Sequence, residues 1–266
     1  MAELVDRPAH SAPPAASSTA PAQPPAISAE EKLMSLAEHL GELRRRLLIS
    51  IITVVLGAVV GWILAPQAMA LVKAPIPGPL YFTQLGGAFM VQLKLALLIG
   101  VALGSPMLLY QLWAFIAPGL TARERRLARP WVPLALLFMV LGFGVAYFIL
   151  PYASAFLLSF QVPDVAEPWI SVEAYFGFVF GLFLAFGVVM QFPIVLVLVS
   201  KAGLVTAERL RRGRRYMLFA IVVLAVIVTP GGDPFSPTIM ALVMYPLYEL
   251  TIYLVGRSSS SAPADG

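Results

Sequence analysis

The sequence predicts an all-α membrane protein with six transmembrane helices. Of its 266 residues, 59% are hydrophobic and only 12% are charged, whereas a soluble domain carries about 25% charged residues. Several stretches approach the ~20 apolar residues that are needed to cross a bilayer core of ~30 Å. These apolar runs are continuous rather than alternating, which favours helices over the strands of a membrane β-barrel.

Six apolar segments are expected to span the membrane, and the last two are short. A helix of about 14 residues with a rise of ~1.5 Å per residue is only ~21 Å long, so the bilayer has to thin there or neighbouring helices have to cover the ends. The alternative is that the boundaries extend by one turn, although Arg215 and Asp233 leave little room for this in the fifth span. The expected spans are about 47–65, 88–112, 131–150, 175–199, 216–228 and 239–254.

Basic residues gather in alternate loops, and this predicts the orientation of the chain. Cytoplasmic loops of membrane proteins carry the excess of lysine and arginine. We therefore expect a multi-pass protein of the inner (plasma) membrane with both termini in the cytoplasm. The cluster from Arg209 to Arg215 is expected to anchor this topology first and to contact anionic lipid second. The cytoplasmic basic residues are Arg44, Arg45, Arg46, Arg123, Arg125, Arg126, Arg129, Lys201, Arg209, Arg211, Arg212, Arg214, Arg215 and Arg257.

The chain divides into a membrane domain and two tails. Residues 1–34 are rich in alanine, proline and serine, which cannot build a core, so we expect a disordered cytoplasmic tail. This segment lacks the apolar region of a secretory signal peptide. Residues 35–256 form the expected six-helix domain, and 257–266 form a short cytoplasmic tail. On the fourth span, the small residues Gly177, Gly181, Ala185 and Gly187 suggest close contacts between helices.

Residues for covalent chemistry are missing. There is no cysteine, and the only histidines are His10 and His39, so we expect no disulfide, no cofactor and no metal site. Nucleotide-binding, hydrolase and metalloprotease motifs are absent as well. A proton pump needs a buried chain of ionisable groups, but the spans hold little beyond Lys94 and Glu249. We therefore expect neither an enzyme nor an autonomous ion-coupled carrier, and no nucleic-acid partner.

Two acids lie among arginines on the expected cytoplasmic face. Glu42 has Arg45 and Arg46 three and four positions further along a helix, so one interpretation is that it pairs with its own arginine. Glu124 lies in "TARERR", and its simplest interpretation is a solvated loop charge. The alternative is that both carboxylates clamp a cationic ligand, because each can accept a bidentate guanidinium and the neighbouring arginines keep each ionised.

Two long motifs around these acids closely resemble those of the TatC family. They are "HLGELRRRLL" (39–48) and "YQLWAFIAPGLTARERR" (110–126). The resemblance continues in order through "AFGVVMQFPIVLVL", "RRYMLFAIVVLAVIVTPGGDPFS" and "YPLYEL". It covers about residues 36–255 and leaves out the proline-rich tail.

This resemblance implies the receptor and core subunit of the twin-arginine protein translocase. Members bind signal peptides with two consecutive arginines on folded proteins, at the cytoplasmic face. They assemble with single-span TatA- and TatB-type partners, and the proton-motive force drives export without nucleotide hydrolysis. The implied fold is a concave, cupped wall of six helices, the last two short. The implied assembly is a homo-oligomer within a larger complex in the lipid bilayer.

The resemblance also implies residue roles. For signal-peptide binding, the matching positions are Glu42, Leu43, Arg44, Arg46, Phe115, Pro118, Glu124, Arg125 and Arg126. For partner binding or structure, they are Pro75, Gln191, Asp233 and Glu249. No catalytic residue is implied.

The chain departs from the family pattern at two places. Many members have glutamate at the position of Gln191, and an amide can form hydrogen bonds but cannot titrate. The usual Pro-Pro-Asp of the last outer loop is here "TPGGDPFS", whose glycines loosen the placement of Asp233.

A small-solute transporter or permease subunit is the alternative function. It would need a substrate site near the middle of the membrane between helices. In this sequence only Gln92 and Gln191, together with small residues, could provide one.

Overall fold

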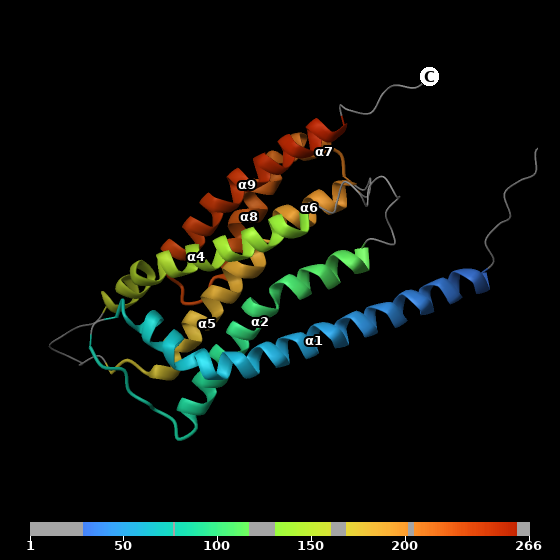
Figure 1. Ribbon diagram of the computed structural model, residues 1–266. Coiled ribbons are helices and arrows are strands. Elements are labelled where there is room, and N and C mark those ends of the chain that lie inside the picture. Colours follow the sequence, from blue (N-terminus) through green and yellow to red (C-terminus); the bar gives the residue numbers. More distant parts are fainter. Residues whose placement is uncertain (1–28, 77, 117–130, 161–168, 202–204, 260–266) are drawn as a thin grey trace, which may run out of the picture. The chain divides into compact units, whose positions relative to one another are not determined.

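A computed structural model describes residues 29–76, 78–116, 131–160, 169–201 and 205–259 of the chain, with side chains in the first helix from Leu40 onward. The chain separates into two units, Met1–Gly41 and Glu42–Gly266, and the second unit holds the packed helices. The described part is helical apart from its loops and one isolated bridge (Figure 1). Its helices are α1 (Ala29–Lys73), α2 (Gly87–Ile116), α4 (Trp131–Leu158), α5 (Val172–Val189), α6 (Phe192–Lys201), α7 (Ala207–Arg212), α8 (Arg214–Val228) and α9 (Phe235–Ser259).

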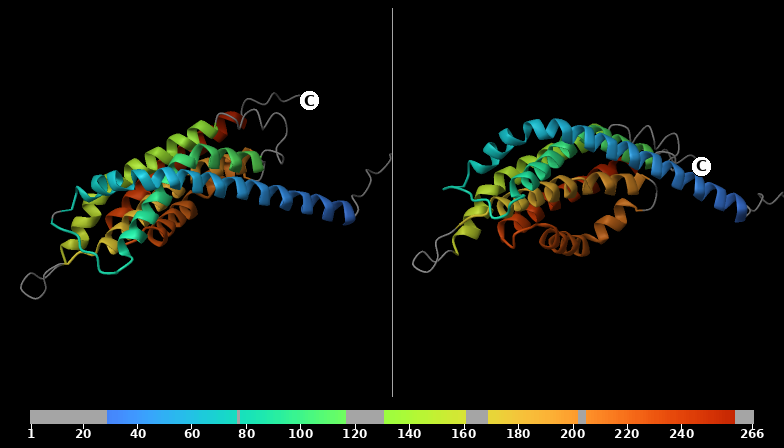
Figure 2. Two further views of the ribbon diagram at one scale, coloured as in Figure 1. Left: turned by 60° about the horizontal axis from the view of Figure 1, so that its bottom comes forward. Right: turned by 90° about the horizontal axis from the view of Figure 1, so that it is seen from below.

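Helix α5 lies at the centre of the packing. It packs against both α2 and α4 (Figure 1), and Val179, Leu182 and Phe186 on α5 are fully buried in the main core. Helix α9 packs against α4, α6, α7 and α8. Helix α8 appears in dark orange next to α9 at the lower edge of the right-hand view of Figure 2. Only Ile221 and Ala225 of α8 are buried, so most of its surface has no protein contacts within the described part of the chain.

Glycines bring the backbones of α1 and α2 into contact. A methyl group on Gly61 would lie 2.4 Å from the carbonyl oxygen of Ala96, and one on Gly57 would lie 2.7 Å from that of Gly100. Gly57 and Gly61 are four positions apart, as are Ala96 and Gly100, so each pair lies on one face of its helix. This is the small-xxx-small contact by which membrane helices pack closely.

The structure confirms the all-α membrane fold. Five described helical segments are long and apolar enough to cross a bilayer. Helix α8 has only 15 residues, as expected of the fifth span. The count of six spans and the concave, cupped wall stay predictions. The five segments are 40–73, 87–115, 133–158, 172–197 and 235–256.

Helix α9 corrects the expectation that both last helices are short. It has 25 residues, from Phe235 to Ser259, whereas the sequence suggested a helix from about residue 239 to 254. The helix begins before Pro237, although proline disrupts the interior of a helix. Pro237 lies in the first turn, where the missing N–H has no intrahelical partner to lose.

The predicted fourth span is divided in two. Helix α5 ends at Val189, a turn covers Met190 and Gln191, and α6 begins at Phe192. Pro193 has no N–H to donate to Val189, so a continuous ladder of helical hydrogen bonds cannot pass this point. The other expected spans extend at one or both ends, and α1 begins at Ala29, within the predicted tail.

Two loops are joined at the end of the molecule where α2 and α5 begin. Tyr81 donates its N–H to Ile170 and accepts from the N–H of Val172, both at 2.9 Å, which forms the isolated bridge to Ser171. The rings of Tyr81 and Trp169 stack with centroids 4.8 Å apart. We call residues 81–84 and 169–173 the loop clasp.

The carboxylate of Glu173 completes the loop clasp. It accepts hydrogen bonds from the N–H groups of Thr83 and Gln84, both at 3.2 Å, and from the hydroxyl of Ser171 at 2.6 Å. A methyl group on Gly87 would lie 1.7 Å from the same carboxylate. The missing side chain of Gly87 therefore makes room for Glu173.

Candidate functional site

Glu42 lies where α1 enters the second unit, and it is bound to its own helix. Its oxygen Oε1 accepts from Arg46 Nε at 3.0 Å and from Arg46 Nη2 at 2.5 Å. Arg46 also donates from Nη1 to Oε1 of Gln111 on α2, at 3.3 Å. Gln111 is buried. Arg46 therefore links the glutamate on α1 to a fixed acceptor on α2.

This geometry agrees with the interpretation that Glu42 pairs with its own arginine. The pairing leaves part of the carboxylate available, however. Both hydrogen bonds from Arg46 end on Oε1, and Oε2 accepts none within the described residues. The side chain of Glu42 is 32% exposed, so Oε2 can accept a further donor from outside the chain.

The neighbours of Glu42 present both charge and apolar surface. Arg44 and Arg45 are exposed, and neither has a carboxylate partner among the residues that the structure describes. Leu43 is exposed as well. Phe115, near the end of α2, is partly buried. Pro118, Glu124, Arg125 and Arg126 lie outside the described residues, so the shared site of Glu42 and Glu124 stays a prediction.

Gln191 lies in the turn between α5 and α6 and is held by backbone groups. Its Nε2 donates to the carbonyl of Ala135 on α4 at 3.2 Å and to that of Gly187 at 3.4 Å. Its Oε1 is buried and has no hydrogen-bond partner in the described part of the chain. In this conformation, the amide joins the turn after α5 to α4, and its Oε1 is not accessible to a partner helix.

Asp233 has a structural role at the start of α9. It is only 3% exposed, and it accepts from the N–H and the hydroxyl of Ser236 at 2.7 and 2.8 Å. These bonds cap the helix. The preceding Gly231 and Gly232 have φ angles of 98° and 72°, a conformation that side chains disfavour. The two glycines thus provide the turn that brings Asp233 to the helix.

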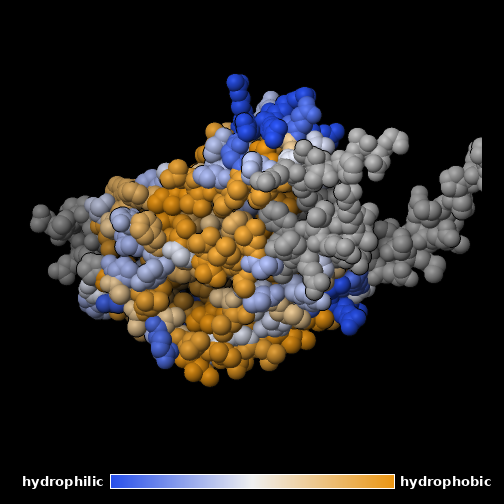
Figure 3. Space-filling model, turned by 45° about the horizontal axis from the view of Figure 1, so that its top comes forward, coloured by the Kyte–Doolittle hydropathy of each residue, from blue (hydrophilic) through white to orange (hydrophobic). Residues whose placement is uncertain are grey.

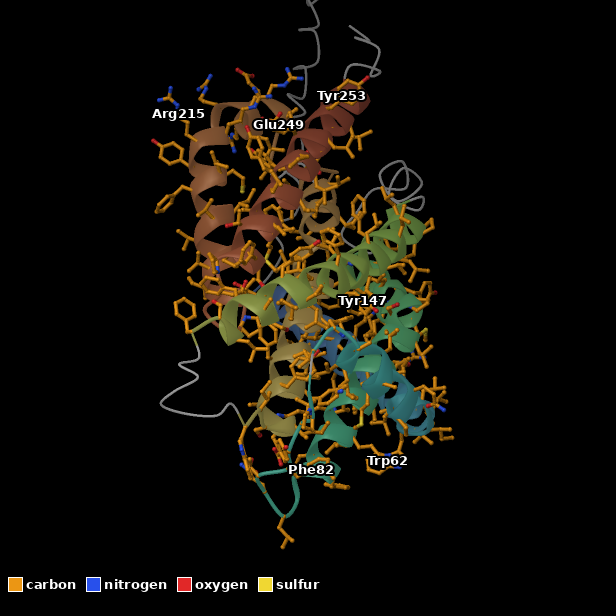
Figure 4. All side chains as sticks on the ribbon, turned by 90° about the vertical axis from the view of Figure 1, so that its left-hand side faces the viewer. Trp62, Phe82, Tyr147, Arg215, Glu249 and Tyr253 are labelled. Carbon is orange, nitrogen blue, oxygen red and sulfur yellow. The ribbon has the colours of Figure 1, made fainter. Side chains whose placement is uncertain are left out.

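Glu249 and Pro75 have local structural surroundings. Glu249 on α9 accepts from Arg214 at 2.7 Å and from the hydroxyl of Tyr245 at 3.3 Å, and Figure 4 shows it near the end of α8. Pro75 lies in the turn that ends α1, where the N–H of buried Ile76 donates to the carbonyl of Lys73 at 3.0 Å.

Sequence reasoning missed three contributors to this architecture. Gln111 was visible as a polar residue inside an apolar motif, but its partner is 65 positions away. The spacing of Gly57 and Gly61 was a usable signal for a close helix contact. Glu173 gave no signal, because its partners belong to a distant loop. No cluster of three potential metal ligands occurs among the described residues.

Comparisons with known proteins cover most of the chain. The family model for the Sec-independent protein translocase protein (TatC) matches residues 38–242. TatC of Carboxydothermus hydrogenoformans is 33% identical over 229 residues, covering 85% of this chain and 94% of the relative. TatC of Escherichia coli K12 is 35% identical over 230 residues, covering 84% and 88%.

Solved structures agree with the sequence comparisons. A crystal structure of the twin arginine translocase receptor TatC in the detergent DDM superposes with a TM-score of 0.70 at 35% identity. It covers 82% of this chain and 99% of the solved one. The family consists of membrane-embedded translocase subunits rather than enzymes. Because the family model and the curated relatives each cover most of it, this chain belongs to the TatC family of Sec-independent protein translocase proteins.

Proposed function

We propose that this chain is the signal-peptide receptor and core subunit of a twin-arginine translocase. In this role it lies in the plasma membrane with both termini in the cytoplasm and binds twin-arginine signal peptides of folded proteins. Family membership and the arginine-rich loops support the proposal. The observation that carries it is the partly exposed carboxylate of Glu42 at the foot of a long apolar helix, where Oε2 accepts no hydrogen bond from the described residues.

An incoming arginine can compete with Arg46 for Glu42. An i,i+4 ion pair on a helix surface contributes only about 0.3–0.5 kcal/mol. A charged hydrogen bond to a well-positioned guanidinium contributes about 1.5–3 kcal/mol. Arg46 keeps Gln111 as a second acceptor if it turns away from Glu42. Replacing the guanidinium of Arg46 by that of the peptide at Glu42 therefore costs the receptor little free energy.

A second acid makes the site selective for two arginines. We assign this role to Glu124, with Arg125 and Arg126 keeping it ionised. The remaining positions shape the site around the peptide. Leu43 and Phe115 contact its apolar part, Pro118 shapes the loop, and Arg44 and Arg46 position the two carboxylates.

Single-span partners of the TatA and TatB type complete the translocase. The unpacked faces of α1 and α8 provide lipid-exposed surfaces for such helices, and several copies of this chain assemble in one complex. Pro75, Gln191, Asp233 and Glu249 keep the helices and loops in place for this assembly. The proton-motive force drives export, but Gln191 cannot carry the proton because its amide does not titrate.

Peptide binding to the purified full chain tests the receptor role. Glu42→Gln and Glu124→Gln each lower the affinity for a twin-arginine peptide by about tenfold, the equivalent of ~1.4 kcal/mol, and the double variant lowers it further. Glu208→Gln is the matched control, because Glu208 also pairs with an arginine four positions away, Arg212. Unchanged affinity in the double variant would disprove the recognition scheme.

The structure gives no support to a solute transporter. Gln92 and Gln191 both donate to backbone carbonyls, of Trp62 and Ala135 respectively. A cavity of about 450 Å³ lies between α1, α2, α4 and α5, but its lining is almost wholly apolar and includes neither glutamine. A polar solute would find no hydrogen-bond partners there.

A further inference from the structure

We propose that the junction of α7 and α8 binds the phosphate groups of anionic phospholipids. The site consists of Arg209, Arg211 and Arg215, and together with Arg212 and Arg214 we call it the arginine corner. This inference is independent of signal-peptide binding, because it concerns the opposite end of the sequence and a different ligand.

Charge at the arginine corner is only partly compensated. Arg212 pairs with Glu208 at 3.4 Å, and Arg214 pairs with Glu249 at 2.7 Å. The other three arginines have no carboxylate partner within the described residues. Three guanidinium groups thus remain for an external anion, and phosphate suits them because its oxygens match the donor geometry of arginine.

The backbone that carries these arginines is fixed. Leu210 is buried, and its carbonyl accepts from the hydroxyl of Tyr248 on α9 at 2.7 Å. The hydroxyl of Thr206 caps α7 by accepting from the N–H of Arg209 at 3.3 Å. The N–H of Gly213 donates to the carbonyl of Arg209 at 2.9 Å. With Leu210 held inward, Arg209 and Arg211 are exposed on either side of it, and the guanidinium of Arg211 lies next to Gly256 on α9.

The arginine corner borders a surface suited to hydrocarbon. On α8, Tyr216, Phe219 and Ile227 are 82%, 71% and 75% exposed, and only Ile221 and Ala225 are buried. Figure 3 shows a hydrophilic cluster at the upper edge of a face of the molecule that is otherwise largely hydrophobic. Figure 4 shows Arg215 at the end of α8, pointing away from the other helices. Phosphates next to acyl chains are the chemistry of a phospholipid.

The short length of α8 explains why bound lipid would be useful at this position. Fifteen residues at ~1.5 Å each span about 22 Å, less than the ~30 Å of an ordinary hydrocarbon core. Headgroups next to α8 must therefore move toward the middle of the bilayer. Arginines that bind their phosphates stabilise this displaced position. A soluble acidic protein would satisfy the charges but has no acyl chains to contact the apolar face of α8 below them.

Lipid binding to the delipidated, detergent-solubilised full chain tests this proposal. Native mass spectrometry measures the affinity for phosphatidylglycerol and for phosphatidylcholine with the same acyl chains. We expect a preference for phosphatidylglycerol that falls about fivefold for each of Arg209→Gln, Arg211→Gln and Arg215→Gln, and roughly hundredfold for the triple variant. The triple arginine-to-lysine variant keeps most of the preference, because the positive charges remain.

Three controls distinguish lipid binding at the arginine corner from a general effect of charge. Lys73→Gln removes one positive charge at the carboxyl-terminal end of α1, outside the arginine corner. We expect this variant to keep the preference for phosphatidylglycerol unchanged. Inorganic phosphate at millimolar concentration does not displace the lipid, and displacement would assign the site to free phosphate instead. An equal preference in the wild type and the folded triple glutamine variant would overturn the proposal. An acidic soluble protein bound in place of lipid would overturn it as well.

Discussion

Arg46 donates to two acceptors that differ in exposure. Glu42 is partly exposed, whereas Gln111 is buried on the neighbouring helix. The neighbour four positions away was predictable from helical spacing, because it depends on local geometry alone. The second acceptor was not, because it depends on how α1 and α2 cross.

Removing Gln111 tests whether Arg46 has to be released. In Gln111→Leu, Arg46 has lost its alternative acceptor and stays with Glu42. We expect the affinity for a twin-arginine peptide to fall about threefold to fivefold, the equivalent of ~1 kcal/mol. Isothermal titration with the purified chain measures this change. Gln92→Leu serves as control, and an equal loss in both variants would contradict the assignment.

Glu173 is the second residue whose partners were hidden from sequence reasoning. In Glu173→Ala, the N–H groups of Thr83 and Gln84 lose their acceptor. We expect their hydrogen exchange to become at least tenfold faster, which corresponds to a decrease of about 1.4 kcal/mol in the free energy of local opening at those amides. Helix α4, which has no part in the loop clasp, should keep its exchange rates. Unchanged rates at both amides would show that the loop is held by other contacts.

At the scale of elements, helix type was predictable and helix ends were not. Long apolar runs identified the spans because a bilayer demands about 20 apolar residues. The division after α5 follows from Pro193, and the early start of α9 follows from the cap by Asp233. Both helix boundaries depend on a single backbone N–H group: the one that Pro193 lacks, and the one of Ser236 that Asp233 caps. A hydropathy pattern carries no information on backbone donors.

The contact between α1 and α2 depends on glycine at two positions. In Gly61→Ala the new methyl group would lie 2.4 Å from the carbonyl oxygen of Ala96, so the helices have to separate. We expect a loss of about 1–3 kcal/mol in stability, measured as a lower thermal midpoint in detergent. Gly144→Ala on α4 is the matched control, because nothing lies within 4 Å of the added methyl group. A similar midpoint for both variants would contradict the proposed contact.

At the scale of the whole molecule, one short helix accompanies several long ones. The five spanning segments have 22–34 residues, and α8 has 15. The sequence predicted the family and the membrane fold because its motifs are long and specific. It offered the pairing of Glu42 with its own arginine as one of two interpretations and could not decide between them, because that choice depends on competing partners.

Local thinning next to α8 is testable because the chain contains no cysteine. We expect the single cysteine of Phe219→Cys, one turn below Arg215, to react with a water-soluble maleimide in liposomes. The cysteine of Val140→Cys, at an exposed position in the middle of α4, should react at least tenfold more slowly, because bilayer hydrocarbon excludes the reagent. Equal protection of both positions would mean that the bilayer keeps its thickness around α8.

The loop clasp sets an order for biogenesis. Thr83 leaves the ribosome 90 residues ahead of Glu173, so the first helical hairpin is inserted before its acceptor has been synthesised. The amides at 83 and 84 must remain hydrated until α5 arrives. A nascent chain that stops short of residue 173 should expose this loop to protease, and the completed chain should protect it. The first helical hairpin therefore reaches its final structure only after residue 173 has been translated.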